Sequence, residues 1–125
     1  MHLASIAALI LVAAAATVAA TAADRNRVPG ATPAGKPVSC IPLAQIRQSL
    51  VRDDRTIDFV MTGRRVYRTT LPNACPSLGF EQRFAYETSL SQLCSTDIIT
   101  VLYAAPIGRG ASCGLGQFQP VTLAK

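Results

Sequence analysis

Hydrophobic and polar residues alternate with a period of two through much of the chain, which is the pattern of β-strands with one buried face. In residues 56–63, Ile57, Phe59 and Met61 occupy every second position. Residues 66–71 are again rich in β-branched and aromatic residues, and a glycine lies between the two runs. We therefore predict a β-hairpin that turns at this glycine.

Three further segments predict strands, and two predict short helical pieces. Residues 80–88 alternate cleanly, residues 97–103 are rich in β-branched residues, and residues 117–123 form a final run. Residues 42–50 carry an apolar stripe behind a proline, which favours a short helix, and residues 89–93 match one helical turn with a capping box. The sum is a mainly β fold, a small antiparallel sheet of about five strands with one short N-terminal helix; α+β is the alternative.

The beginning of the chain has a different composition. Residues 3–23 carry no charge and consist mostly of alanine and other apolar residues, which is typical of a secretory signal peptide. An uncleaved membrane anchor is the alternative, because about 20 apolar residues can span a bilayer. Cleavage after Ala22, or one residue later, would leave a mature protein without a transmembrane segment, in the periplasm or outside the cell.

Composition divides the chain into three parts. Residues 1–23 are the expected signal peptide. Residues 24–39 are rich in proline and glycine and hold little that a core could bury, so we expect a flexible linker. Residues 40–125 are expected to form a single domain that contains all four cysteines. A chain this short buries only ~60% of its unfolded surface, so cross-links would add much of its stability.

The four cysteines, Cys40, Cys75, Cys94 and Cys113, lie far apart in the sequence. A structural zinc site needs ligands at short spacing and usually histidine, and the single histidine is His2, in the expected signal peptide. We therefore expect two disulfides that cross-link the domain, rather than free thiols or bound zinc. Sequence alone leaves three connectivities open. We favour the nested pairing Cys75–Cys94 with Cys40–Cys113.

The carboxylates form no recognisable catalytic or metal-binding pattern. The densest group is Asp53-Asp54 followed by Asp58, and we expect a turn before a strand there rather than a cation site, because adjacent strand residues point to opposite faces. Asp97 is expected to cap a turn rather than to act as an acid. Glu81 and Glu87 are expected to face solvent.

Other catalytic classes lack their required residues. The expected mature chain contains no histidine, which excludes Ser-His-Asp and Cys-His catalysis. The glycine-rich stretch 108–116 lacks the Gly-Lys-Ser/Thr ending of a phosphate-binding loop, so we expect a turn around Cys113. We expect no catalytic residue, no bound metal and no cofactor.

The charge balance is basic. Twelve Lys and Arg against seven Asp and Glu give a formal net charge of +5. Arg64, Arg65 and Arg68 lie on or beside the predicted hairpin, with Tyr67 between them. Arginine beside an aromatic ring can bind phosphate, a sulfated glycan or an anionic envelope surface, so these four residues are our candidate anion-binding patch. A merely solvated surface is the alternative, and nucleic acid is not an expected partner of an exported protein.

Residues 40–123 contain a series of short motifs. Cys40 and Ile46 come first, followed by DDRTIDF, GRRVYRTTLPNACPSLGFEQRFAY, LCSTDIITVL and CGLGQFQPV, the last beginning at Cys113. Their order and spacing resemble a family of small exported bacterial proteins that is defined only as a domain of unknown function. The resemblance covers nearly all of the expected domain and implies export, four cysteines and a compact fold. It implies no activity and no ligand.

These observations favour one function and leave two alternatives. The favoured function is a noncatalytic binding module of the bacterial envelope or periplasm, whose scaffold presents a basic or aromatic surface. The first alternative is a structural or accessory protein that contacts another exported protein, for example through a sheet edge. The second is a small enzyme that uses carboxylates.

Overall fold

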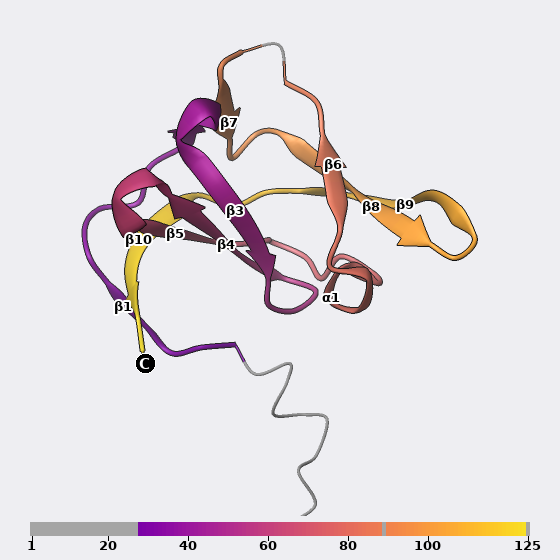
Figure 1. The fold of residues 1–125 in the computed structure, drawn as a ribbon, viewed down its shortest axis with the longest axis horizontal. Coiled ribbons are helices and arrows are strands. Elements are labelled where there is room, and N and C mark those ends of the chain that lie inside the picture. Colours follow the sequence, from indigo (N-terminus) through magenta and orange to yellow (C-terminus); the bar gives the residue numbers. More distant parts are fainter. Residues whose placement is uncertain (1–27, 89, 125) are drawn as a thin grey trace, which may run out of the picture.

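The computed structural model describes residues 28–88 and 90–124. The expected signal peptide, residues 1–23, and the first part of the expected linker lie outside these residues. The described residues form three antiparallel sheets, which confirms the mainly β prediction (Figure 1).

The largest sheet has five strands in the order β1-β10-β5-β4-β3. Its strands are β1 (Ala31–Pro33), β10 (Phe118–Leu123), β5 (Val66–Thr70), β4 (Thr56–Met61) and β3 (Ile46–Val51). The predicted hairpin over residues 56–71 is confirmed, because β4 and β5 pair directly and turn through the 3-10 segment η3 (Thr62–Arg64).

Two smaller sheets complete the fold. One pairs β2 (Cys40–Pro42) with β7 (Gln92–Cys94), and the other has the order β6-β8-β9. Its strands are β6 (Phe84–Tyr86), β8 (Ile98–Ala104) and β9 (Ile107–Gly114). The short helical elements are the 3-10 turn η2 (Leu43–Gln45) and the single-turn helix α1 (Leu78–Glu81).

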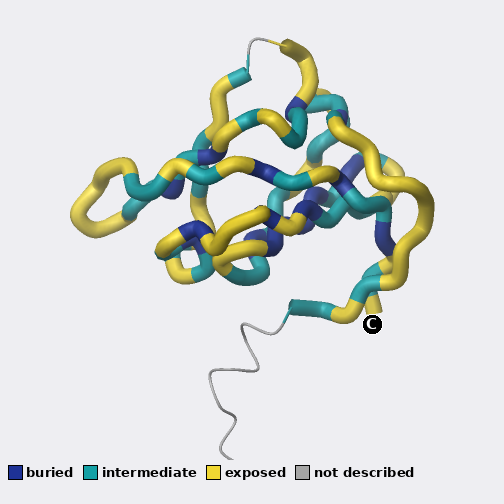
Figure 2. The backbone as a smooth tube through the Cα atoms, turned by 180° about the vertical axis from the view of Figure 1, so that it is seen from behind, coloured by how far each residue is buried: buried dark blue, intermediate teal, exposed yellow. Residues whose placement is uncertain are grey.

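The core lies between the five-stranded and three-stranded sheets and is seen as the dark interior of Figure 2. Phe59 of β4 is its centre. Its ring packs edge-on against Phe118 of β10, with centroids 5.8 Å apart, and against Phe84 of β6, with centroids 6.4 Å apart. Such aromatic contacts add to the burial of apolar area. One β4 side chain thereby joins both sheets.

Residues 42–50 do not form the expected N-terminal helix. After η2 the chain continues as β3, which pairs with β4 so that Leu50 lies opposite Asp58 and Val51 opposite Ile57. The apolar stripe had suggested a helical period, but hydrogen bonding to a neighbouring strand outweighs a weak local preference. Arg47 therefore lies on strand β3 and not on a helix.

Residues 80–88 form a strand only over β6. Residues 78–81 form α1, which buries Leu78 but leaves Phe80 87% exposed, so the alternation over residues 80–88 does not mark a single buried strand face. The carboxylate of Asp54 accepts a 2.7 Å hydrogen bond from the Gly79 N–H and so holds the helical turn in place. Such a long-range contact is invisible in a local alternation pattern.

The glycine-rich segment 108–116 is mostly strand β9, not a turn. It pairs with β8 from Ile107 to Gly114. At Gly110 a Cβ atom would lie 2.7 Å from the ring of Tyr103, so the glycine lets the aromatic ring of β8 pack over β9. Of the predicted helical turn over residues 89–93, Gln92 and Leu93 belong to strand β7 instead, and residue 89 lies outside the described residues.

Part of the expected linker belongs to the fold. β1 pairs with the outer edge of β10, and Val38 forms a β-bridge with Phe118. Edge pairing uses backbone groups and tolerates proline, so a segment with little to bury can still be ordered. The described part of the expected flexible linker, from β1 to Val38, is therefore paired with β10.

The four cysteines form two disulfides, as expected, but the pairing differs from the nested one we favoured. The bonds are Cys40–Cys94 and Cys75–Cys113. Cys40 and Cys94 are direct cross-strand partners in β2 and β7, with Cα atoms 4.0 Å apart. The pairing follows from strand register, which the spacing of cysteines does not reveal.

Gly116 lies between β9 and β10, where the backbone of β5 approaches it closely. Its N–H donates to the hydroxyl of the buried Thr69 at 3.1 Å, and that hydroxyl donates to the Gly116 carbonyl at 2.8 Å. A Cβ atom at this position would collide with the carbonyl oxygen of Thr70. The backbone approach therefore requires glycine.

We expect Gly116→Ala to lower the free energy of unfolding by about 2 kcal/mol, because the strand must shift to relieve the collision. Gly114→Ala is the matched control, since nothing lies within 4 Å of a Cβ atom there. It should change the free energy of unfolding by no more than about 0.5 kcal/mol. Urea denaturation measures both, and equal effects of the two substitutions would contradict the prediction.

Candidate functional site

The four residues of the predicted anion-binding patch do not lie together. Tyr67 and Arg68 are neighbours on β5 and point to opposite faces: Tyr67 packs against the core, and Arg68 binds Asp58 on the outer face of the five-stranded sheet. Arg65 donates to the Gln45 side chain at 2.8 Å. Arg64 lies exposed in the turn. Two of the four, Arg64 and Arg65, remain available at the end of the β4–β5 hairpin.

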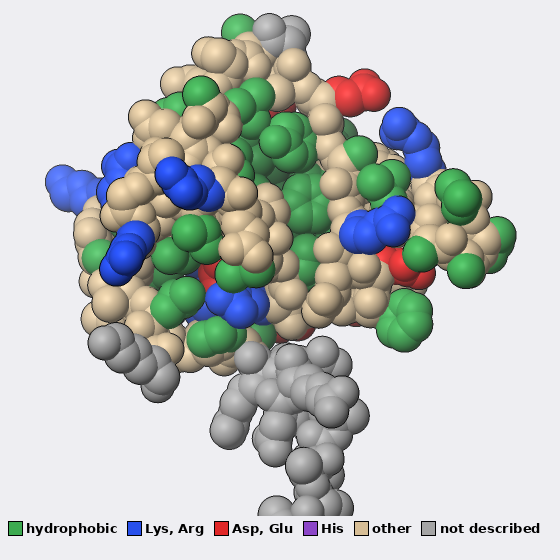
Figure 3. Space-filling model, viewed as in Figure 1, with side chains coloured by type: hydrophobic (Ala, Val, Ile, Leu, Met, Phe, Trp, Pro, Cys, Tyr) green, Lys and Arg blue, Asp and Glu red, His purple; other side chains and the backbone are tan. Residues whose placement is uncertain are grey.

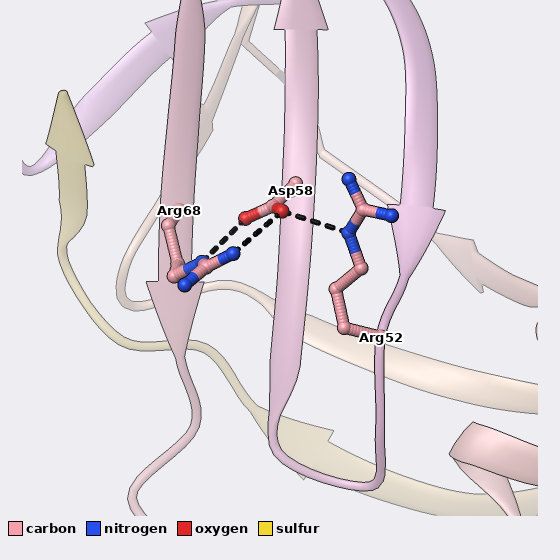
Figure 4. A network of polar contacts seen from close by, with 3 residues as sticks. All are labelled: Arg52, Asp58 and Arg68. Atoms are coloured by element: carbon pink, nitrogen blue, oxygen red, sulfur yellow. Dashed lines mark hydrogen bonds and ion pairs between the residues drawn. The ribbon is translucent and has the colours of Figure 1, made fainter. Parts of the chain in front are cut away.

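A buried ion-pair network accounts for Arg68 (Figure 4). Asp58 is fully buried, and both of its oxygens accept from arginines. Arg68 donates from Nε to Oδ1 at 2.8 Å and from Nη2 to Oδ2 at 3.0 Å, while Arg52 donates from Nε to Oδ2 at 2.8 Å. A bidentate arginine and a second donor satisfy a carboxylate that would otherwise be costly to bury.

Strand register creates this network. Asp58 of β4 lies directly opposite Arg68 of β5, and opposite Leu50 of β3 on its other side. Arg52 follows β3 in the turn that leads to β4, where its N–H donates to the Thr56 carbonyl at 2.8 Å. Two arginines from either side of the strand therefore converge on one carboxylate.

The network also shifts the protonation of Arg68. The hydrogen bonding of Arg68 to the Asp58 carboxylate raises the pKa of the Arg68 guanidinium above its ordinary value, and the negative charges of Asp58 and Asp53 raise it further, against the opposing effect of burial. Because the folded pKa is raised, this stabilisation is present at physiological pH, below the ordinary arginine pKa, and on the alkaline side it is lost only as the pH rises through the raised value. Arg68 thus stays charged and paired throughout the physiological range.

A second group of arginines lies at the turn of the β4–β5 hairpin. We call Arg47, Arg64 and Arg65 the basic corner. Arg47 and Arg64 both line a hollow of about 290 Å³, together with Val60, Met61 and Gly63. No carboxylate lines this hollow, and both ion pairs among residues 28–88 and 90–124 involve Asp58 instead. Arg47 and Arg64 are therefore available to a ligand, and Arg65, which follows Arg64, is bound only to the neutral side chain of Gln45.

Sequence reasoning missed Arg47. The expected helix over residues 42–50 gave no reason to bring it to the hairpin turn. In the structure the register of β3 shifts between Ile46 and Gln48, as at a β-bulge, and Arg47 is exposed beside the turn. Bulges commonly re-aim a side chain at a sheet edge, but no local motif in this sequence indicates one.

The carboxylates singled out in the sequence have structural roles. Asp53 accepts from the Arg55 N–H at 2.8 Å, which confirms the expected turn. Asp97 accepts from the Cys94 N–H at 2.7 Å and so caps the turn after β7, also as expected. Glu81 does not simply face solvent, because it accepts from the Ala104 N–H at 3.3 Å. Within the described part of the chain, no three His, Cys, Asp or Glu side chains gather as metal ligands would.

Two other hollows carry both charges and are less suited to anions. One, of about 390 Å³ on the three-stranded sheet, is lined by Arg109 together with Glu87 and Asp97. The other, of about 520 Å³, is lined by Arg52 and Arg55 together with two aspartates. The basic corner is distinguished from both because no carboxylate lines its hollow.

Comparisons with models of protein families, with curated proteins and with solved structures find no match to this chain. No helix among the described residues is long and apolar enough to cross a membrane. The fold and the site define a small β domain that is cross-linked twice and carries a basic corner at one hairpin turn.

Asp58→Asn should lower the free energy of unfolding by about 2 kcal/mol, because the amide replaces a charged acceptor and turns an N–H₂ group toward two arginines. The figure is below the usual cost of breaking a buried pair, since the side chains of Arg52 and Arg68 are 23% and 15% exposed and can regain water. Glu87→Gln removes the same charge from an exposed position and should change the free energy of unfolding by about 0.5 kcal/mol or less. Urea denaturation of both variants measures the two changes. A larger loss of unfolding free energy in Asp58→Asn indicates a structural ion pair, whereas equal losses would indicate a general effect of charge and contradict the prediction.

Proposed function

We propose that the chain is an exported, noncatalytic binding protein of the bacterial envelope or periplasm, and that it binds a polyanion through the basic corner. The observation that carries this proposal is the gathering of Arg47, Arg64 and Arg65 around a turn where no carboxylate lines the hollow. Arg47 comes from strand β3, and Arg64 and Arg65 come from the turn between β4 and β5.

The chemistry of arginine indicates the class of ligand. A guanidinium group offers several N–H donors in a planar fork that matches phosphate, sulfate and carboxylate groups. Several such groups at one turn favour a polymer or surface with repeated anions over a single small anion. We therefore expect a phosphorylated, sulfated or uronic-acid-bearing component of the envelope.

Two disulfides support the exported part of the proposal. All four cysteines are cross-linked, and disulfides form and persist in oxidising compartments such as the periplasm and the cell exterior. The apolar, uncharged residues 3–23 supply the export segment. The noncatalytic part rests on the carboxylates, of which Asp53, Asp58 and Asp97 are already engaged in turns or ion pairs.

A second candidate function is an accessory protein that contacts another exported protein through a sheet edge. The free edge of β3 favours it: within residues 28–88 and 90–124, β3 pairs only with β4. An unpaired edge six residues long can accept a strand from a partner. Such binding would depend on backbone hydrogen bonds and would be insensitive to salt.

Binding to heparin, a soluble sulfated polymer, tests the polyanion proposal. The double variant Arg47→Ser/Arg64→Ser should bind about 30-fold more weakly than the parent protein at low salt, if each arginine near an anionic surface contributes about 1 kcal/mol. Arg83→Ser/Arg109→Ser removes the same charge from exposed arginines elsewhere and should weaken binding much less. Equal weakening in the two double variants would point to net charge alone and overturn the basic corner as the site; salt-insensitive binding would favour the accessory function.

Export and cross-linking are tested by mass spectrometry of the protein recovered from the periplasm or medium. We expect an N-terminus at Ala23 or Asp24 and no reaction with a thiol-labelling reagent before reduction. After reduction, four thiols should react. Recovery of the full 125-residue chain in the membrane fraction would instead indicate a retained anchor.

A further inference from the structure

The turn that joins β3 to β4 and the segment that leads into α1 line a common hollow of about 520 Å³. The turn supplies two arginines and two aspartates, residues 52–55, and the segment supplies Ala74, Gly79 and Phe80. Sites for small ligands have volumes of about 300–1,000 Å³ and combine apolar walls with a few polar groups. Both the size and the lining of this hollow fit that description.

Hydrogen bonds join the two walls of the hollow. The Asp54 carbonyl accepts from the Cys75 N–H at 2.8 Å, and the Asp54 carboxylate accepts from the Gly79 N–H at 2.7 Å. A Cβ atom at Gly79 would lie 3.0 Å from the same carboxylate oxygen, so the walls approach closely. Cys75 is also cross-linked to Cys113 of β9. Because the domain itself holds both walls, a ligand would have little to order on binding.

The two arginines of the hollow are anchored and remain charged. Arg52 donates from Nε to the buried Asp58 at 2.8 Å, and this is its only side-chain hydrogen bond to the described residues. Both of its Nη groups can therefore donate to a ligand (Figure 4). Arg55 donates from Nε to the Leu71 carbonyl at 3.1 Å and from Nη2 to the Pro72 carbonyl at 3.3 Å.

The two aspartates keep one oxygen each for a ligand. Oδ1 of Asp53 accepts from the Arg55 N–H, and Oδ1 of Asp54 accepts from the Gly79 N–H, whereas Oδ2 of each accepts from none of the described residues. Neither aspartate forms an ion pair in that part of the chain, where Asp58 is the acid in both pairs. The hollow thus presents positive and negative groups that do not neutralise each other by contact.

Figure 3 shows the same contrast on the surface. Blue side chains dominate the side where the β4–β5 turn lies in Figure 1, whereas both blue and red side chains are seen lower down and toward α1. Two arginines and two aspartates line the hollow, so its charges balance. A ligand that also carries both charges is therefore favoured over an anion or a cation.

Phe80 supplies the apolar part of the lining. Its side chain is 87% exposed on α1, and it lines the hollow together with Ala74. An exposed aromatic ring beside charged groups can pack against an apolar side chain of a ligand whose charged ends bind elsewhere in the hollow.

We propose that this hollow binds a short zwitterionic peptide with apolar side chains. The α-carboxylate binds the Nη groups of Arg52, the α-amino group binds Asp53 and Asp54, and an apolar side chain packs on Phe80. A guanidinium matches a carboxylate in geometry, and a wholly apolar ligand would desolvate the charged groups without pairing them. This goes beyond the polyanion proposal and does not rest on it, because the residues and the class of ligand are different.

Isothermal titration calorimetry with the dipeptide leucyl-phenylalanine tests this proposal. We expect the oxidised parent protein to bind the dipeptide with a Kd of about 1 mM or lower. The same dipeptide with an acetylated N-terminus and an amidated C-terminus keeps both apolar side chains but carries no charge. It should bind at least about tenfold more weakly, because the hydrogen bonds to charged groups are weakened or lost.

Two variants assign the contacts. Asp53→Asn/Asp54→Asn keeps an oxygen at each position to accept from the backbone but removes both charges, and it should weaken binding of the dipeptide about tenfold. Phe80→Ser should weaken it about fivefold and should not disturb the fold, since the side chain is exposed. Ile107→Ser is the matched control, because Ile107 is 92% exposed and does not line this hollow. It should leave the affinity unchanged.

The proposal is overturned if the parent protein does not bind the charged dipeptide at concentrations up to about 10 mM. Equal binding of the charged and blocked dipeptides, or an unchanged affinity in Phe80→Ser, would overturn it as well. Heparin binding is measured in parallel and should be the same in Phe80→Ser and the parent protein. The Arg47→Ser/Arg64→Ser variant should bind the dipeptide normally, so failure of either proposal is recognised separately.

Discussion

The burial of both faces of β4 is the constraint on which the structure depends. On its inner face Phe59 contacts aromatic rings from β6 and β10, so the strand joins the two larger sheets. On its outer face Asp58 is buried as well, and a buried carboxylate is stable only with charged or hydrogen-bonding partners. Arg52 and Arg68 meet this requirement and are thereby withdrawn from the cations that a ligand could use.

The two disulfides stabilise parts of the fold that the small hydrophobic core does not hold by itself. An isolated pair of short strands such as β2 and β7 is marginal in water, and Cys40–Cys94 joins it directly. Cys75–Cys113 ties the loop after β5 to β9 in the other large sheet. The two bonds interleave along the chain, and each closes a loop long enough to contribute about 4 kcal/mol by loop-closure entropy. One bond therefore secures the small β2–β7 sheet from within, and the other ties the two larger sheets together.

The sequence predicts those elements whose local pattern matches their burial. The β4–β5 hairpin, β8 and β10 follow from alternation or β-branched runs. β1, β3 and β9 do not, because each is a strand only through backbone pairing with a partner distant or unsuspected in sequence. The same holds for the basic corner: Arg64 and Arg65 could be predicted from the sequence as candidate ligand-binding residues. Arg47 and the pairing of Arg68 with Asp58 depend on register, which residue types alone do not reveal.

The two hairpin turns can differ in composition because their residues are exposed and take no part in the packing of the core. The β4–β5 turn holds arginines, whereas the β8–β9 tip holds alanine, proline and isoleucine, and neither tip side chain Arg64 nor Ile107 is buried in the core. Figure 1 places the two turns at opposite ends of the long axis. The Cys75–Cys113 bond and the Phe59 contacts hold the sheets between the two turns in place, so each turn can present its own side chains without changing the packing of the core.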